Sequence, residues 1–264
     1  MYSRGEIPND MHKNGELVIQ KNVILAFERA HLKRKIVIFD VGANVGDWTI
    51  SLLNEIKNKI LKNKIDIYLF EPVPSTAEML SKNLPDEKFL HLNECALSST
   101  STTANIYISG ENAGTNSLYD DKLKKEKQLV EIHLISAVDF CNKNSIQHID
   151  LLKCDTEGHD MEVILGALPL LKDEKISIFQ FEYNWRWAFS NHFLRDVFIS
   201  VESLPYKLAK LQENHLLIFD TWHPEIDKFF EGNYALIHND SLSWFPKKRA
   251  CFDRFNALQI TPYP

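Results

Sequence analysis

Short apolar runs alternate along this chain with longer stretches in which apolar residues recur every three or four positions. The short runs have the length of buried strands, and the longer stretches have the period of helices with one apolar face. This alternation predicts βαβ units and therefore a mainly parallel sheet covered by helices. The expected strands are residues 36–41, 65–70, 89–92, 149–154 and 176–181, and the expected helices are 17–32, 46–61, 74–84, 160–171 and 193–204.

The alternation is interrupted between residues 104 and 136, where two strand-like runs surround a long polar loop. It changes again after residue 204, where short strand-like runs follow one another closely. We therefore expect an α/β, Rossmann-like fold whose sheet is mainly parallel, with an antiparallel strand near the C-terminus. The additional expected strands are 104–108 and 129–135, a hairpin of 206–211 and 216–219, and a last strand near 234–237.

No linker-like or low-complexity segment divides the sequence, so we expect one domain over residues 1–264. Within it, residues 1–34 form a helical extension at the N-terminus. Residues 36–182 contain the βαβ pattern and are expected to bind a cofactor. Residues 183–264 are then left to form the side of the molecule that binds the acceptor.

Composition narrows the classes of protein that the chain can belong to. Apolar residues make up 44% of the 264 residues and the net charge is −6, so a broad basic face for nucleic acid is not expected. No apolar run reaches the roughly 20 residues that span a bilayer, and the first residues lack the apolar segment of a signal peptide. The four cysteines have no C-x-x-C spacing, which favours free thiols in a reducing compartment. We expect a cytoplasmic protein.

The turn after the first strand carries the most specific pattern, Asp40-Val-Gly-Ala-Asn-Val-Gly46. The glycines, Gly42 and Gly46, let a backbone approach a ligand closely, and the amides at a helix start favour negative charge. A dinucleotide site would have three glycines in G-x-G-x-x-G spacing, and here the spacing is D-x-G-x-x-x-G. We expect Asp40, Gly42, Asn44 and Gly46 to belong to a nucleotide-cofactor site of another class.

Acidic residues lie at the carboxyl ends of four strands of the expected sheet, namely Asp40, Glu71, Asp155 and Glu182. Ligands of open parallel sheets bind just outside the carboxyl ends of the strands, so these acids should converge on one crevice. Their mutual repulsion requires a cation or a ligand rich in hydroxyls, and Glu71 is suited to accept bonds from two ribose hydroxyls. The alternative is that each acid caps the following helix, which is less natural for Glu71 because Pro72 follows it.

Several motifs resemble those of the FkbM family of methyltransferases. They are Asp40 to Gly46, Phe70-Glu-Pro72, Asn93 with Ala96-Leu97, and Leu152-Lys-Cys-Asp-Thr-Glu-Gly158. The resemblance covers residues 36–182 and implies the class I fold, S-adenosylmethionine (SAM) as cofactor, and O-methylation, often of sugar or polyketide hydroxyls. The sequence departs from the family pattern at Cys154, where an aliphatic residue is usual, and at His159-Asp160, where an apolar residue and Glu are usual.

The resemblance also implies a role for each matching residue. Asp40 to Gly46 would hold the methionine end of the cofactor, with Asp155 beside it. Glu71, followed by Pro72, would bind the ribose. Residues Asn93, Cys95 and Ala96 would frame the adenine.

A hydroxyl acceptor is barely acidic, so methyl transfer to it calls for a positioned base. We rank Glu157 first because Gly158 permits a tight turn there, then His159, then Glu182; His192 is a further candidate. The alternatives are a solvent-facing His159, a helix-start role for His192 and a helix-terminus role for Glu157. Asp155, Glu157 and Glu182 could bind Mg²⁺, but their spacing does not demand it, and we predict no metal.

Residues on the acceptor side are predicted from polarity and aromatic content. Trp185 belongs to an aromatic run that either stacks on a sugar ring or closes the core. Asn116 and Ser117 lie in the polar loop, which could fold over bound ligand, and His192 is the fourth acceptor-side residue that we expect.

The sequence therefore predicts a SAM-dependent O-methyltransferase whose acceptor is a small molecule or glycan, with a sugar hydroxyl favoured, and which binds no nucleic acid. The alternatives are a methyltransferase for RNA or protein, a NAD-dependent oxidoreductase, and a nucleotide-binding protein without catalysis.

Overall fold

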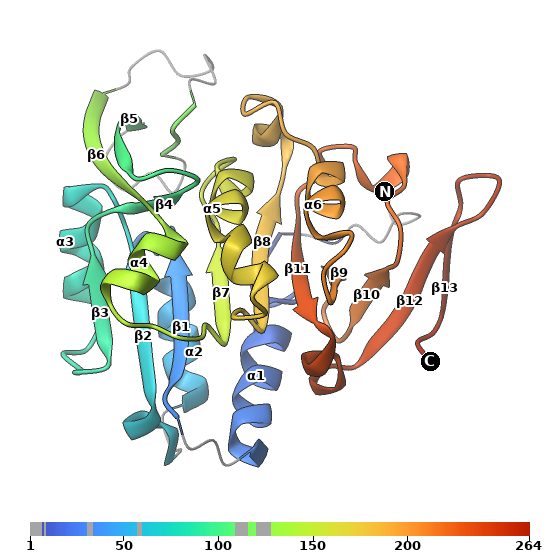
Figure 1. Cartoon of the computed structure of the whole chain (residues 1–264), viewed down its shortest axis with the longest axis horizontal. Helices are drawn as coiled ribbons and strands as arrows, with labels where there is room; N and C mark the ends of the chain where they lie inside the picture. The colour runs from blue at the N-terminus through green and yellow to red at the C-terminus, as the bar shows by residue number, and fades with distance from the viewer. Residues whose placement is uncertain (1–6, 8, 31–33, 57–59, 109–115, 120–127) are drawn as a thin grey trace.

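The computed structural model describes residues 7, 9–30, 34–56, 60–108, 116–119 and 128–264. A twisted ten-stranded sheet runs through the molecule, and helices cover both of its faces (Figure 1). The sheet has the order β13-β12-β10-β9-β11-β8-β7-β1-β2-β3, so the first strand lies inside the sheet rather than at its edge. No helix in these described ranges is long and apolar enough to cross a membrane.

The first half of the sheet is parallel, as the alternating pattern predicts. Strand β1 pairs with β2 on one side and with β7 on the other, so the order of the strands reverses between β1 and β7. In a doubly wound sheet this reversal opens a crevice at the carboxyl ends of the strands. The parallel strands are β1 (Ile36–Val41), β2 (Ile65–Phe70), β3 (Leu90–Asn93), β7 (Leu151–Cys154) and β8 (Ile178–Tyr183).

The second half of the sheet contains the antiparallel pairs. The predicted hairpin is present, but the expectation of a last strand near residues 234–237 is wrong, because two more strands follow. These two strands form the edge of the sheet, and most of their residues are exposed or half-exposed. They therefore lack the apolar run that identifies a buried strand. The strands of this half are β9 (Tyr206–Leu211), β10 (Leu216–Phe219), β11 (Gly232–His238), β12 (Lys247–Phe252) and β13 (Leu258–Pro262).

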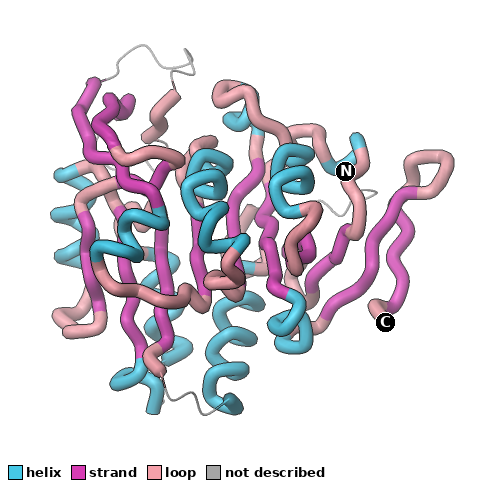
Figure 2. Tube along the Cα trace, viewed as in Figure 1, coloured by secondary structure: helices cyan, strands magenta, loops and turns pink. Residues whose placement is uncertain are grey.

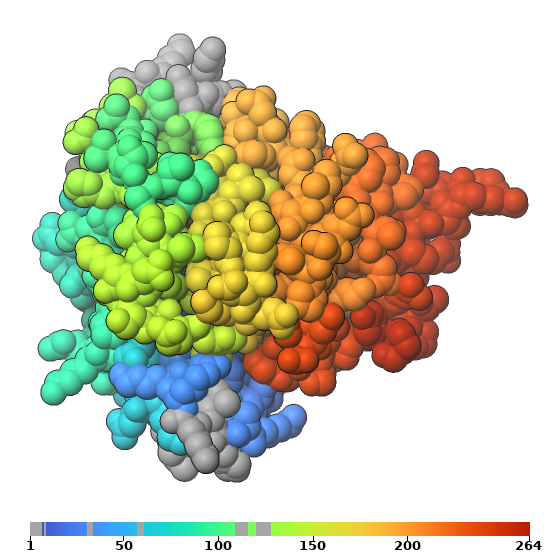
Figure 3. All heavy atoms as spheres, in the orientation of Figure 1, coloured from blue at the N-terminus to red at the C-terminus, as the bar shows by residue number. Residues whose placement is uncertain are grey.

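Figure 3 shows how this edge differs from the rest of the near face. The turn between β12 and β13 stands out from the body of the molecule, whereas the helices over the parallel half form a continuous surface. Phe255 in that turn is 73% exposed.

Helices lie in two layers, and the alternation of side chains along the strands explains the division. In β1, Ile36 and Ile38 pack in the core shared with α1 and α2, and Phe39 and Val41 pack in the core shared with α4 and α5. Figure 2 shows the layer of α4, α5 and α6 across the near face. The helices are α1 (Glu16–Ala30), α2 (Asp47–Ile56), α3 (Pro74–Asn83), α4 (Ala137–Lys143), α5 (Asp160–Lys172) and α6 (Leu194–Val201), with 3₁₀ turns η2 (Ile60–Lys64), η3 (Trp185–Ala188), η4 (Pro224–Ile226) and η5 (Asn239–Trp244).

A separate three-stranded sheet stands above the carboxyl ends of the parallel strands. It consists of β4 (Ala96–Ser98), β5 (Thr102–Ile108) and β6 (Gln128–Ser136), with β6 in the middle. Gly166 of α5 lets this sheet approach, since a Cβ there would lie 1.9 Å from the Ser98 carbonyl oxygen. Both predicted strands of this region are confirmed, whereas three-residue β4 and seven-residue α4 are too short to show a period.

Candidate functional site

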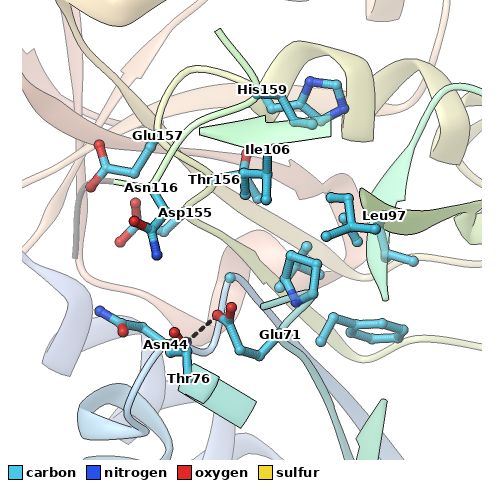
Figure 4. A pocket seen from close by; sticks show the side chains of 17 residues that line it. Asn44, Glu71, Thr76, Leu97, Ile106, Asn116, Asp155, Thr156, Glu157 and His159 are labelled. Carbon is cyan, nitrogen blue, oxygen red and sulfur yellow. Dashed lines mark hydrogen bonds between the residues drawn. The ribbon is translucent and has the colours of Figure 1, made fainter. Parts of the chain in front are cut away.

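A pocket opens at the reversal of strand order, between the carboxyl ends of β1, β2 and β7 and the small sheet above them (Figure 4). It encloses about 710 Å³ of space, including open solvent at its mouth. One part of its wall is apolar and comes mainly from β2 and the small sheet. That part comprises Val41, Phe70, Pro72, Ala96, Leu97, Ile106, Leu118 and Ile132, and the polar part comprises Asn44, Glu71, Thr76, Asn116, Asp155, Thr156, Glu157 and His159 beside Gly42.

The glycine turn after β1 forms the base of the pocket. Gly42 has φ +74°, and a Cβ there would lie 2.0 Å from the carbonyl oxygen of Asp155. The turns after β1 and β7 are therefore in direct contact, and only glycine allows it. Gly46 has φ +99°, and a Cβ there would lie 2.8 Å from Leu80 Cδ1 of α3. Gly42 lines the pocket, whereas Gly46 supports the turn from behind.

Glu71 faces the pocket from the end of β2 and is only 5% exposed. Its Oε2 accepts a hydrogen bond from the Asn44 amide and its Oε1 accepts one from the Val73 amide, both at 3.0 Å. Burial raises the pKa of Glu71 to about 7, against the effect of these two bonds. Each oxygen keeps further acceptor capacity, so the carboxylate can bind a pair of hydroxyl groups on a ligand.

Asp40 does not line the pocket, although its position in the motif predicts cofactor contact. Its side chain points to the α1–α2 face of the sheet, where Thr49 Oγ1 donates to its Oδ2 at 2.6 Å. Lys153 pairs with it across the β1–β7 register, with Nζ 3.3 Å from Asp40 Oδ1 and 3.7 Å from Asp155 Oδ2. Burial lowers the pKa of Lys153, but the carboxyls of Asp40, Asp155 and Glu16 raise it above its ordinary value.

Lys153 is thus an element of the site that we did not predict. It is 4% exposed and lies in a strand whose four residues are all buried. A lysine inside such a strand is itself a signal, because buried lysine requires a partner. The effect of this arrangement is to fix Asp40 beneath the pocket and Asp155 in its wall.

The turn after β7 directs Glu157 into the pocket (Figure 4). Glu157 has φ +54° and Gly158 has φ +97°, so two successive residues are left-handed, in agreement with the predicted tight turn. Glu157 Oε2 lies 2.8 Å from Arg186 Nη1. Burial, and then the charge of Asp155, raise the pKa of Glu157 to about 8, and Arg186 opposes that rise.

His159 also lines the pocket but is buried rather than facing solvent. Its Nδ1 lies 3.0 Å from Tyr119 Oη, and its Nε2 lies 3.0 Å from Ser98 Oγ. Burial lowers the pKa of His159 to about 4, so the ring is neutral near pH 7. With both nitrogens engaged and a weakly basic ring, His159 is a poorer base than Glu157.

Glu182 lies within β8, one residue before its end, and does not line the pocket. It accepts hydrogen bonds from Asn9 Nδ2 at 2.8 Å and from Asn184 Nδ2. Burial, and then the charges of Asp155 and Glu157, raise the pKa of Glu182 well above its ordinary range. Its carboxyl is therefore linked to the N-terminal segment and lies behind the pocket wall.

Three residues were predicted beside an adenine ring, and the structure brings one of them to the pocket. Ala96 lines the wall. Asn93 donates to the carbonyl oxygens of Leu69 and His91 instead, and Cys95 packs against the core. Most of the apolar wall comes from residues such as Ile106 and Ile132, which carry no pattern that would have singled them out.

The four predicted acceptor-side residues are also divided. Asn116 lines the pocket, and Ser117 next to it donates from Oγ to the Glu157 carbonyl oxygen at 2.9 Å. Trp185 lies outside the wall with its ring 4.7 Å from the Arg186 guanidinium. His192 lies outside it too, and its Nε2 is 3.0 Å from Glu162. Part of the predicted polar loop, residues 110–115, lies outside the described residues.

Comparison with known proteins identifies the family. A sequence model described as "Methyltransferase FkbM domain" matches residues 40–230, which is well over half of the chain. The chain belongs to the FkbM methyltransferase family. This membership removes the NAD-dependent oxidoreductase from the alternatives, because the family is one of methyltransferases.

Other proteins are similar to this FkbM-family chain over shorter or more divergent stretches. Methyltransferase sdnD of Sordaria araneosa is 28% identical over 171 residues, which are 53% of this chain and 64% of that protein. The precorrin-6y C5,15-methyltransferase of Geobacter metallireducens is 11% identical with a TM-score of 0.41, over 84% of this chain and 87% of that one. The magnesium protoporphyrin IX methyltransferase of Synechocystis is 9% identical with a TM-score of 0.39, over 84% and 80%.

S-adenosylmethionine is the cofactor of the FkbM family, and the residues of the pocket fit it. Glu71 can accept bonds from the two ribose hydroxyls, and the apolar wall suits a planar ring. Asp155 and Glu157 suit the cationic part of the molecule. When bound, this cofactor supplies an electrophilic methyl group. Among the residues that the structure describes, no three His, Cys, Asp or Glu side chains are placed to hold a metal ion.

Proposed function

We propose that this FkbM-family protein transfers a methyl group from S-adenosylmethionine to a hydroxyl oxygen, with Glu157 as the base. The supporting observation is a buried carboxyl on the pocket wall whose pKa is raised by burial to about 8. A base works best when its pKa is near the working pH, because it is then both available and strong enough to take a proton. A hydroxyl acceptor needs that base, since its proton must leave as the new bond forms.

The acceptor that we propose is a sugar of a glycan or glycosylated metabolite. Saccharides present hydroxyls and no phosphate charge, which suits a site surrounded by acids. Asp155, Glu157 and Glu182 act on one another electrostatically there, and Glu231 adds to them. The negatively charged phosphodiester backbone of RNA would be repelled by these carboxyls and by the net charge of −6.

The experiment is transfer of a labelled methyl group from S-adenosylmethionine to a panel of acceptors. The panel should contain free sugars, glycosides, sugar nucleotides and oligosaccharides, with bulk RNA and a peptide mixture as the rival classes. Mass spectrometry of the product then identifies the methylated atom. A labelled methyl group found on a saccharide oxygen, as an ether, supports the proposal. A labelled methyl group found in RNA, in peptide or on a carbon atom contradicts it.

The role of Glu157 is tested with Glu157→Gln, which keeps the size of the side chain but cannot take the proton. We expect kcat to fall about 10²- to 10⁴-fold, the usual contribution of a general base, while S-adenosylhomocysteine still binds. In the parent protein, kcat/KM should rise with pH through a midpoint near 8, since Glu157 must be ionised to act. A fully active Glu157→Gln would remove Glu157 as the base.

A further inference from the structure

Arg186 contacts the proposed base directly and has no role in the function described so far. It belongs to η3, the short turn that follows β8, and its Nη1 lies 2.8 Å from Glu157 Oε2. The side chains of both residues are largely covered, at 16% and 19% exposure. Such a covered ion pair is screened much less by salt than a surface pair.

Apart from Arg186, the charged groups that act most strongly on Glu157 oppose its ionisation. Asp155 is on the same turn and Asp160 begins α5. Glu231 precedes β11 and Glu182 lies in β8. In the part of the chain that the structure describes, Arg186 is the cation paired with Glu157. Without the cation, a carboxyl surrounded in this way would stay protonated to a still higher pH, and a protonated carboxyl cannot accept a proton.

We propose that Arg186 is a positioning residue that favours the ionised form of the Glu157 carboxyl and directs it into the pocket. This inference rests on the proposed function, in which Glu157 takes the proton of the acceptor hydroxyl. Arg186 acts through Glu157 and need not touch the acceptor itself.

Three contacts hold Arg186 in place, one at its guanidinium and two at its backbone and Cβ. The Trp185 ring lies 4.7 Å from it, an arrangement in which the cation is attracted to the ring face. Asn184 caps the start of η3, and its Oδ1 accepts a hydrogen bond from the Arg186 amide at 2.9 Å. Gly158 lets the two turns approach, because a Cβ there would lie 2.8 Å from Arg186 Cβ. The pair is therefore assembled by the two turns and does not depend on a mobile surface side chain.

The test compares Arg186→Gln with Arg186→Lys and with the matched control Arg195→Gln. Arg195 also lies over a tryptophan, Trp222, with its guanidinium 5.5 Å from the ring, but it is not paired with Glu157. Two quantities are measured for each protein. One is the pH profile of kcat/KM, and the other is the pKa of Glu157 from the ¹³C shift of its carboxyl carbon, assigned by the loss of that signal in Glu157→Gln.

We expect Arg186→Gln to move both midpoints upward by at least one pH unit, which lowers kcat/KM at pH 7 about tenfold. The loss should shrink as the pH rises. Arg186→Lys should restore most of the parent profile, and Arg195→Gln should leave it unchanged. An equal loss at every pH, or an unmoved Glu157 pKa in Arg186→Gln, would overturn the inference. If Arg186→Gln does not fold, Arg186→Lys and Trp185→Leu are compared instead. A parent-like pH profile in Arg186→Lys supports the inference, because that variant keeps the charge at this position. A displaced profile in Arg186→Lys together with an unmoved one in Trp185→Leu overturns it.

The two proposals fail in different ways. If Glu157→Gln is active, Glu157 is not the base, but the carboxyl titration still shows whether Arg186 controls its ionisation. If Glu157→Gln is inactive and Arg186→Gln leaves both midpoints unmoved, the base assignment stands and the role of Arg186 is refuted.

Discussion

The contact between the turns after β1 and β7 gives the sharpest test of the pocket's construction. Gly42 has φ +74°, and a Cβ added to it would lie 2.0 Å from the Asp155 carbonyl oxygen and 3.0 Å from the carbonyl carbon. Gly42→Ala therefore combines an unfavourable backbone conformation with an atomic overlap. The overlap involves backbone, so no side-chain rotation can relieve it.

The size of the effect follows from these two contributions. An L-residue other than glycine in the left-handed region costs about 1–2 kcal/mol. Relieving the overlap requires the two turns to separate by more than an ångström, and forcing extra atoms into a packed site typically costs about 1–3 kcal/mol. We expect Gly42→Ala to lower the free energy of unfolding by about 2–5 kcal/mol, which is a large share of the total for most domains.

The assay is equilibrium unfolding by denaturant, followed by calorimetric titration with S-adenosylhomocysteine at a temperature where the variant is folded. Because the same displacement moves the pocket's base, we expect the affinity to fall at least tenfold. Gly232→Ala is the matched control, since a Cβ there meets no atom closer than 3.5 Å and the backbone is not left-handed. That control should be unchanged or slightly more stable. A Gly42→Ala variant with parent stability and affinity would refute the close contact of the two turns.

Three further results are expected. Lys153→Met should lower the free energy of unfolding by about 3–5 kcal/mol, measured by denaturant titration, because it leaves Asp40 buried without its cation; unchanged stability would contradict the pairing. Glu71→Ala should weaken S-adenosylhomocysteine binding by calorimetry and also lower stability, since the Asn44 and Val73 amides lose their acceptor; parent-like affinity would exclude the ribose role. The thermal midpoint of the unliganded protein should fall as the pH rises from 6.5 to 8.5, because carboxyls with raised pKa contribute stability below their unfolded pKa and lose it through their folded pKa. The groups concerned are Glu16 and Glu71, both raised to about 7, and Glu157, raised to about 8. A midpoint that rises over this interval would contradict their burial.

The parallel half of the fold could be predicted because its central strands β1, β7 and β8 are buried on both faces. Residues 36–41 and 65–70 are mostly apolar, with one aspartate in each, and the structure gives β1 and β2 these same bounds. The turns could also be placed, because glycine adopts a positive φ without strain and Gly42, Gly46 and Gly158 all have one. The pocket lies where these strands end, so its position followed from the topology.

The motif alone could not predict whether a residue at the end of a strand faces the pocket or the α1–α2 face of the sheet. Asp40 and Glu71 both follow apolar runs, but Asp40 lies inside β1 and points to the α1–α2 face, while Glu71 lies beyond β2 and faces the pocket. The pairing of Asp40 with Lys153 joins residues 113 positions apart and depends on the register of β1 with β7. Arg186 was missed for a similar reason, because its contact with Glu157 requires the docking of two separate turns.

The order in which the chain is made has a consequence for how this sheet forms. A ribosome releases roughly 5–20 residues per second, N-terminal end first. Strand β1 can pair early with β2 at residue 65, but its other edge waits for β7 at residue 151. For on the order of 5–20 s a buried strand has an open apolar edge, which is a known route to aggregation. One contact of Asn9 forms later still. Its side-chain amide contacts the Glu231 carboxylate, and Glu231 is synthesised 222 residues after Asn9. The acid cluster around the base is therefore completed only after seven of the ten strands of this described sheet have been synthesised.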